Sequence, residues 1–311
     1  MKPWIQAARL RTLPLAISGI LLGCAQAYLY QLFNLEILIW GMVTAILLQI
    51  LSNYANDYGD FLKGTDTKAN RQDRALASGK ISASQMKIAL FLLSIGTLIS
   101  GLFLLSKGIE EINNSYYILL FIGILSIAAA IMYTVGKKAY GYYGFGDIFV
   151  FIFFGLVSVG GIFFLHTKFI SSDAILASFG LGLLSTGVLN VNNMRDIITD
   201  KENGKNTLVV KMGIQNTLRY HKVLIWGGFV FTVASFLLHI KLTTEKVNQF
   251  EYLMLVASFG PIAYLLGRHM SIINELKTEQ KDAYNKELKN LSLTILLFVI
   301  FYWLIAYLYA A

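Results

Sequence analysis

Long apolar blocks separated by polar stretches run through almost the whole chain. Nine of these blocks approach the ~20 residues that a helix needs to cross a bilayer. Each block predicts a membrane-spanning helix, because lipid offers backbone polar groups no hydrogen-bond partner. The predicted spans are Leu13–Leu32, Leu38–Asn56, Ile88–Leu105, Tyr117–Val135, Asp147–Leu165, Ala174–Asn193, Val223–His239, Tyr252–Gly267 and Leu291–Tyr309.

The polar stretches between the spans differ in length and content. Two are long, at about residues 57–87 and 194–222, and both follow an even-numbered span, so they lie on the same side of the membrane. Long connections in compact domains are often functional. We expect these two to cap a single membrane domain that comprises residues 1–311.

Each long stretch begins with a similar group of polar residues. In the first, Asn53 precedes Asp57 by four positions, and Asp60 and Asp66 follow. In the second, Asn192 precedes Asp196 by four, and Asp200 follows by four. Basic residues come next in both stretches, which suggests two related halves; they are Arg71, Arg74, Lys201 and Lys205.

The acidic groups predict a magnesium–diphosphate site. Asp196 and Asp200 share a face if the helix continues that far, and two like charges there repel unless a cation neutralises them. Oxygen donors suit Mg²⁺, which binds through a few carboxylates together with substrate phosphate oxygens. The basic residues would hold the remaining phosphate charge. One such pair alone would more often be a solvated helix end, but two on one side favour a site.

Composition and charge agree with a membrane protein. Hydrophobic residues make up 56% of the chain and charged residues only 14%, whereas soluble domains carry about 25%. With the N-terminus in the cytoplasm, all but four of the 26 Lys and Arg residues lie on the cytoplasmic side, as the positive-inside rule requires. Topology therefore explains the net charge of +8, and we expect no nucleic-acid partner.

The single cysteine, Cys24, excludes an intrachain disulfide and a cysteine-based metal site.

A diphosphate site at the membrane boundary suits an amphipathic substrate. Its hydrocarbon tail would lie in lipid or between helices, while its head reaches the metal. Mg²⁺ would make the diphosphate a better leaving group. If the tail is allylic, departure leaves a carbocation, which aromatic side chains can stabilise. The chain offers many, including FVFIFFG at Phe149–Gly155, although most aromatics in spans serve packing.

Several motifs together resemble those of the UbiA superfamily of intramembrane aromatic prenyltransferases. The resemblance is closer to one branch, the 1,4-dihydroxy-2-naphthoate polyprenyltransferases of menaquinone biosynthesis, and it covers the first six spans and the stretch after them. The motifs are RLRTLP (Arg9–Pro14), QILSNYANDYGDFLKGTD (Gln49–Asp66), AYGYYGFGD (Ala139–Asp147), FFGLVSVGG (Phe153–Gly161) and NVNNMRD (Asn190–Asp196) with NGKNTL (Asn203–Leu208).

The resemblance assigns candidate roles residue by residue. Metal ligands are expected among Asn56, Asp57, Asp60, Asp66, Asp196 and Asp200, with Asp57, Asp60 and Asp196 as catalytic carboxylates. Diphosphate-binding residues are expected to be Lys63, Arg74, Lys137, Arg195 and Lys205. Further site candidates are Asn53, Asn192, Asn193, Tyr133, Tyr140, Arg9 and Arg11, the last three for the acceptor. Asp66 follows the Lys63–Gly64 insertion, and Asp147 stands where glutamate is usual, so the roles of these two stay open.

The resemblance also implies a fold and a reaction. We expect an all-α protein with nine transmembrane helices around a central cavity that opens sideways to lipid, in a bacterial inner membrane with the site facing the cytoplasm. With Mg²⁺, it would transfer a polyprenyl chain from an all-trans polyprenyl diphosphate to 1,4-dihydroxy-2-naphthoate, with loss of CO₂ and diphosphate, to give demethylmenaquinone.

Two other functions remain as alternatives. A related enzyme could use another aromatic acceptor, such as 4-hydroxybenzoate, although the KGTD and NVNNMRD stretches argue against it. A secondary transporter would need charges at mid-span depth and broken helices there, whereas the acids here lie at span ends. A purely structural role would not require paired Asn–Asp groups.

Overall fold

The computed structural model describes residues 2–65, 74–243 and 249–310, and within these ranges every regular element is helical. Three short elements begin the chain or join longer helices: α1 (Lys2–Ala8), η1 (Leu10–Thr12) and η2 (Tyr140–Tyr143). The remaining elements are α2 (Leu13–Leu29), α3 (Leu35–Leu62), α4 (Ala83–Gly108), α5 (Asn114–Met132), α6 (Gly146–Val150), η3 (Phe151–Gly160), α7 (Gly161–Thr167), α8 (Ser172–Glu202), α9 (Leu208–Thr243), α10 (Gln249–Ser258), α11 (Gly260–Glu275) and α12 (Lys281–Ala310).

The described helices confirm the predicted spans. Among the described residues, eight helical segments are long and apolar enough to cross a membrane, and the bent pair α10–α11 makes a ninth if it is one span. The 43° bend of that pair falls just before Pro261, which cannot donate a backbone hydrogen bond and whose ring crowds the preceding turn. Large apolar side chains are exposed along the spans, as they are in an integral membrane protein.

Local polar groups decide where several spans begin. Asn34 starts α3 by accepting hydrogen bonds from the backbone N–H groups of Glu36 and Ile37. Ser82 starts α4 with a capping box, in which Ser82 and Gln85 satisfy each other's backbone donors. Such caps satisfy N–H groups that the first helical turn leaves without partners.

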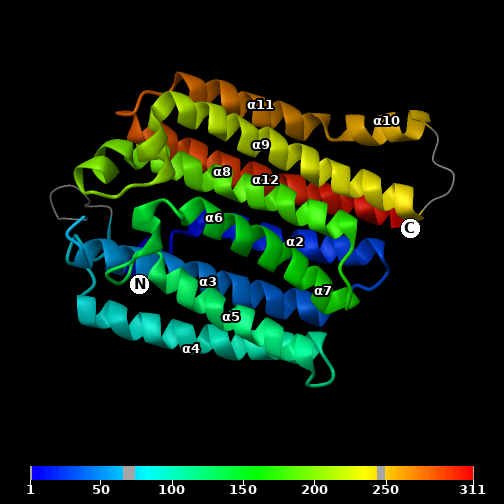
Figure 1. Cartoon of the computed structure of the whole chain (residues 1–311), viewed down its shortest axis with the longest axis horizontal. Helices are drawn as coiled ribbons and strands as arrows, with labels where there is room; N and C mark the ends of the chain where they lie inside the picture. Colours follow the sequence, from blue (N-terminus) through cyan, green and yellow to red (C-terminus); the bar gives the residue numbers. More distant parts are fainter. Residues whose placement is uncertain (1, 66–73, 244–248, 311) are drawn as a thin grey trace.

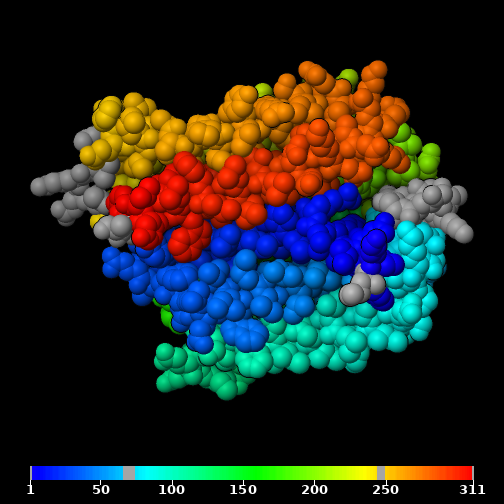
Figure 2. All heavy atoms as spheres, turned by 180° about the vertical axis from the view of Figure 1, so that it is seen from behind, coloured from blue at the N-terminus to red at the C-terminus, as the bar shows by residue number. Residues whose placement is uncertain are grey.

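The helices form a bundle of nearly parallel rods (Figure 1). Helix α2 lies centrally and packs on α3, η3 and α12, while α8 packs on α9, η3 and α12. Helices α4 and α5 pack on each other and on α3 at one edge. Figure 2 shows from behind that α12 and α2 run side by side above α3 and α4. The core that joins α8, α9 and α12 contains fully buried Phe236, Phe298 and Tyr302.

The expected cap at about residues 194–222 differs from the structure. Helix α8 continues to Glu202 and α9 begins at Leu208, with a break in its helical backbone at Gly213 (φ 72°, ψ 166°), so that the non-helical parts of this segment are residues 203–207 and the kink at Gly213. Polar residues extend α8 because its last turns bury Arg195, Asp196 and Asp200 against other parts of the chain instead of leaving them in water. The first expected cap, about residues 57–87, likewise begins with two turns of α3 and ends with the start of α4.

Candidate active site

Two helices bring their polar ends together on the side of the bundle that carries α1. On α3, Asn53, Asn56 and Asp60 follow one another at helical spacing, so they share a face. On α8, Asn192, Asp196 and Asp200 repeat every four residues and also share a face. The two acidic stretches of the sequence therefore meet in space.

A small polar cavity of about 40 Å³ lies where these two faces meet. Nine of the residues predicted from sequence line it: Arg9, Asn56, Asp60, Arg74, Tyr133, Asn192, Asp196, Asp200 and Lys205. Three carboxylates and three basic side chains thus face one space. Such a mixture suits an anion together with a cation.

Asp60 is fixed by a tyrosine that the sequence analysis did not single out. The Tyr142 hydroxyl donates to Asp60 Oδ1 at 2.8 Å and lies 2.9 Å from Thr65 Oγ1. Lys63 Nζ lies 3.6 Å from the centre of the Tyr142 ring, and Lys205 Nζ lies 5.4 Å from it. Burial and the neighbouring Asp60 carboxylate raise the pKa of Tyr142 above its ordinary value, so the hydroxyl keeps its proton and remains a donor.

Lys205 lies between carboxylates. Its Nζ is 3.6 Å from Asp200 Oδ1, and the residue is buried. Burial alone would lower the pKa of the ammonium, but the carboxylates of Asp60 and Asp200 raise it above its ordinary value. Lys205 is therefore charged throughout the neutral range, and it places a fixed positive charge beside the small cavity.

The oxygen donors of the small cavity fit a magnesium ion that a substrate helps to hold. Asp200 Oδ2 is buried without a hydrogen-bond partner among the described residues, so one carboxylate oxygen is available as a ligand. Within those same residues, no three carboxylate, histidine or cysteine side chains converge closely enough to hold an ion unaided. Mg²⁺ usually combines a few carboxylates with phosphate oxygens and water, which agrees with this incomplete set.

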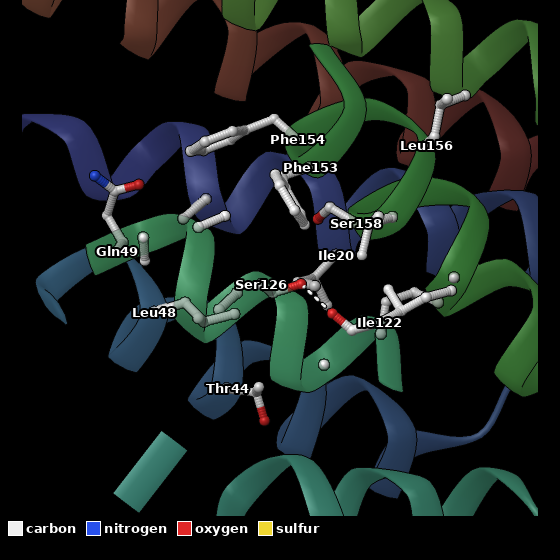
Figure 3. Close-up of a pocket in the computed structure, with 18 of the residues that line it drawn as sticks. Ile20, Thr44, Leu48, Gln49, Ile122, Ser126, Phe153, Phe154, Leu156 and Ser158 are labelled. Atoms are coloured by element: carbon white, nitrogen blue, oxygen red, sulfur yellow. Dashed lines mark hydrogen bonds between the residues drawn. The ribbon is translucent and has the colours of Figure 1, made fainter. Parts of the chain in front are cut away.

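A large apolar cavity of about 960 Å³ adjoins the small one. It lies mainly among α2, α3, α4, α5, α6, η3, α7 and α8, and Figure 3 shows Phe153 and Ser158 of η3 lying toward Ser126 and Ile122 of α5. η3 is a π-helical segment of ten residues; such widened turns are rare and often occur at functional sites.

Four residues line both cavities and therefore mark their junction: Arg9, Asn56, Tyr133 and Asn192. Arg9 has a left-handed backbone with φ 48°, which is uncommon for a residue with a side chain and is found where function requires it. A ligand with an anionic head and an apolar tail would place the bond between them at this junction.

Other predicted site residues lie around the cavities. Asn53 donates to the Ala8 carbonyl and to Thr12, which ties α3 to the N-terminal segment. Tyr140 lines the apolar cavity, stacks on Phe149 and donates to the Ala129 carbonyl.

Several predicted residues line neither cavity. Asp57 is buried beside Arg74, at 4.0 Å. Arg195 donates to both oxygens of Asp196, to Asn192 and to Asn285, and so positions the acidic face of α8. Lys63 lies over the Tyr142 ring, and Arg11 donates a hydrogen bond to Asn285. Asn193 is buried, and so is Asp147, which accepts a hydrogen bond from Tyr220. Lys137 is exposed. Asp66 lies outside the described residues.

Sequence reasoning missed residues that line the small cavity, such as Asn203 and Thr65, and others that hold its lining residues in place, such as Tyr142 and Asn285. Asn203 continues the helical spacing of Asp196 and Asp200, so periodicity would have found it. Tyr142 and Thr65 belong to separate segments that only the fold brings together. Asn285 of α12 accepts hydrogen bonds from both Arg11 and Arg195, and no motif marks it.

Comparison with known proteins gives one consistent result. The model of the UbiA prenyltransferase family matches residues 16–291. The 1,4-dihydroxy-2-naphthoate octaprenyltransferase of Haemophilus influenzae is 45% identical over 72% of this chain and 74% of its own length. The Escherichia coli protein of the same name is 44% identical over 73% of this chain and 74% of its own.

A solved structure shows the same fold. The UbiA homologue from Archaeoglobus fulgidus bound to DMAPP and Mg²⁺ superposes with a TM-score of 0.61 at 14% identity, over 96% of this chain and 98% of that one.

Proposed function

The chain belongs to the UbiA prenyltransferase family, and from that membership and its similarity to the naphthoate prenyltransferases of H. influenzae and E. coli we propose that it prenylates 1,4-dihydroxy-2-naphthoate. The donor is an all-trans polyprenyl diphosphate, and the products are CO₂, diphosphate and demethylmenaquinol, the quinol form that a separate two-electron oxidation turns into demethylmenaquinone. One observation carries the proposal: a small cavity lined by acids and bases adjoins a large apolar cavity, and four residues line both. The names of the similar curated proteins support the naphthoate acceptor and an octaprenyl donor.

The diphosphate binds in the small cavity, and the prenyl tail lies in the apolar one. Lys205, Arg74 and Arg9 offer positive charge to the phosphate oxygens. The reacting carbon, C1 of the donor, then lies at the junction beside Asn56, Tyr133 and Asn192, because the diphosphate and the tail occupy the two cavities.

Magnesium completes this site. Asp60, Asp196, Asp200 and the Asn56 amide oxygen are the side chains that would hold it. When bound, it draws negative charge from the diphosphate and makes it a better leaving group. The solved A. fulgidus homologue was bound to Mg²⁺ together with DMAPP, which supports a divalent metal beside the diphosphate.

The acceptor reaches C1 from the apolar side. The ring carbon that bears the carboxylate forms a bond to C1, and the C1–O bond breaks with its electron pair leaving on the diphosphate. The carboxylate then leaves as CO₂, and its bonding electrons restore the aromatic ring. Asp60 faces the small cavity whereas Asp57 lines neither cavity, so Asp60 acts on the side of the leaving diphosphate, as a ligand of the cation. Arg9 and Tyr140 line the apolar cavity where the acceptor enters.

The proposed location is a bacterial inner membrane with the site facing the cytoplasm. The distribution of Lys and Arg along the chain supports this orientation, since most basic residues flank the end that carries the site.

Acceptor choice tests the proposal. Purified protein with Mg²⁺ and a polyprenyl diphosphate is offered 1,4-dihydroxy-2-naphthoate and 4-hydroxybenzoate in turn, and the product masses are measured. We expect prenylated naphthoquinol that lacks the carboxyl group. Product from 4-hydroxybenzoate alone would replace the naphthoate assignment with the alternative one.

Tyr142→Phe is expected to lower kcat/KM by about tenfold, because it removes a charge-assisted hydrogen bond to Asp60 while keeping the ring on which Lys63 lies. Steady-state rates at varied donor concentration measure the effect. Tyr143→Phe is the matched control, since Tyr143 is the exposed neighbour and lines neither cavity. Equal rates for both variants would contradict the role of the Tyr142 hydroxyl.

A further inference from the structure

A glutamine of α3 lies at the wall of the apolar cavity, beyond the residues that face the small one. Gln49 precedes Asn53 by one helical turn and Asn56 by two, so the three side chains share a face of α3. The seven residues from Gln49 to Asn56 span about 10 Å at ~1.5 Å per residue. Because Asn56 marks the junction of the two cavities, Gln49 is a polar group placed inside the apolar cavity.

Thr12 determines which way the Gln49 amide faces. Thr12 Oγ1 donates to the Arg9 carbonyl at 2.9 Å, and it accepts from Gln49 Nε2 and from Asn53 Nδ2, each at 3.1 Å. A hydroxyl has one proton and two lone pairs, so Thr12 can only accept from the two amides. The Gln49 nitrogen therefore faces Thr12. Figure 3 shows this nitrogen turned away from the other labelled residues of the cavity and the carbonyl oxygen turned toward them.

The Gln49 carbonyl oxygen is left as an acceptor in an apolar space. Within the described residues no hydrogen bond reaches Gln49 Oε1, and the side chain is half-buried. A hydroxyl of the same cavity differs, because Ser126 donates to the Ile122 carbonyl of its own helix. A carbonyl oxygen cannot use that device, since it needs a donor. Leaving it without one away from water costs free energy, so a ligand with an O–H or N–H group is favoured beside Gln49.

The aromatic acceptor carries such a donor, whereas the hydrocarbon tail of the prenyl diphosphate has none. In 1,4-dihydroxy-2-naphthoate the 1-hydroxyl is next to the carboxylate and donates to it within the molecule. The 4-hydroxyl lies too far from the carboxylate for such a bond. It therefore needs an acceptor from the protein when it leaves water.

We propose that Gln49 recognises the aromatic acceptor by accepting a hydrogen bond from its 4-hydroxyl. The rings then lie between Gln49 and the junction, with the reacting carbon toward C1 of the donor. Gln49 is thus a specificity-determining residue, and Thr12 is the positioning residue that orients its amide. The inference rests on the proposed function and adds an acceptor contact to it.

Gln49→Leu tests the contact with two related molecules. The KM is measured for 1,4-dihydroxy-2-naphthoate, and the inhibition constant is measured for 1-hydroxy-2-naphthoate, which lacks only the 4-hydroxyl. Loss of the dihydroxynaphthoate product gives this constant whether or not the analogue reacts. We expect the KM to rise about tenfold, as for one lost hydrogen bond in an apolar site. The inhibition constant is expected to change less than about twofold, and the KM for the prenyl donor is expected to stay the same.

Two further variants make the result specific. Gln215→Leu is the matched control, because Gln215 is exposed on α9 and lines neither cavity; it is expected to keep all three wild-type constants. Gln49→Met keeps a side chain of similar length, and it is expected to show the same selective rise, so it decides the matter if Gln49→Leu is not monodisperse in detergent. Equal rises in the KM and the inhibition constant, a rise only in the donor KM, or no rise would overturn the contact.

The same assay separates this inference from the proposed function. Wild-type protein that forms no prenylated naphthoate contradicts the proposed function itself. Wild-type protein that prenylates the naphthoate, together with Gln49 variants that keep its KM, contradicts only the contact between Gln49 and the 4-hydroxyl.

Discussion

Asp60→Asn is expected to lower kcat/KM for prenyl transfer by about a hundred- to a thousandfold. Asparagine has nearly the same shape as aspartate and can still accept the hydrogen bond from Tyr142. It lacks the negative charge that the site uses to hold a cation beside the diphosphate. The loss therefore measures the charge of the carboxylate more than its size.

Two measurements make the Asp60 result specific. Titration with Mg²⁺ is expected to show a higher half-saturating concentration in Asp60→Asn, because one anionic ligand is gone. Asp282→Asn, which neutralises an exposed acid at the start of α12, is expected to leave both rate and titration unchanged. If Asp60→Asn keeps wild-type activity, the Asp60 carboxylate has no role in the proposed reaction.

Lys205→Met is expected to lower kcat/KM for the donor by at least about a hundredfold. Methionine keeps much of the apolar stem but removes the charge, and losing two charge-assisted contacts of about 1.5 kcal/mol each accounts for this factor. The buried Asp200 would lose its neighbouring cation as well. Lys201→Met is the matched control, because Lys201 is exposed on the last turn of α8 and lines neither cavity.

The charge of Lys205 also gives a pH expectation. Its pKa is raised in the folded protein, so the protonated form is stabilised below the ordinary lysine pKa, and this stabilisation is lost only as the pH rises through the raised value. Lys205 therefore keeps its charge between about pH 6 and pH 9, and we expect no rise in the KM for the donor from this residue over that range. An alkaline rise in wild-type KM that disappears in Lys205→Met would assign a lower pKa to this lysine.

Helical periodicity accounts for what the sequence predicted well. Apolar blocks of membrane-spanning length mark the spans, and the four-residue spacing of Asn192, Asp196 and Asp200 places them on one face. These signals are local, so no tertiary information is needed to interpret them.

Side-chain direction within a motif is harder to predict. Asp57 and Arg195 each lie next to a cavity residue in sequence, but one residue along a helix turns the side chain by about 100°. The structure accordingly places Asp57 beside Arg74 and Arg195 on Asp196. The contacts of Tyr142 and Asn285 join distant segments, so periodicity carries no information about them.

The position of a bound metal and diphosphate is the most direct test of the site formed by α3 and α8. An experimental structure with Mn²⁺ in place of Mg²⁺ and a non-hydrolysable polyprenyl diphosphate analogue would locate the metal by its anomalous scattering. We expect the metal among Asp60, Asp196 and Asp200, the diphosphate beside Lys205, and the tail in the apolar cavity. A metal or diphosphate bound elsewhere, with these three carboxylates making no contact to either, would contradict this site.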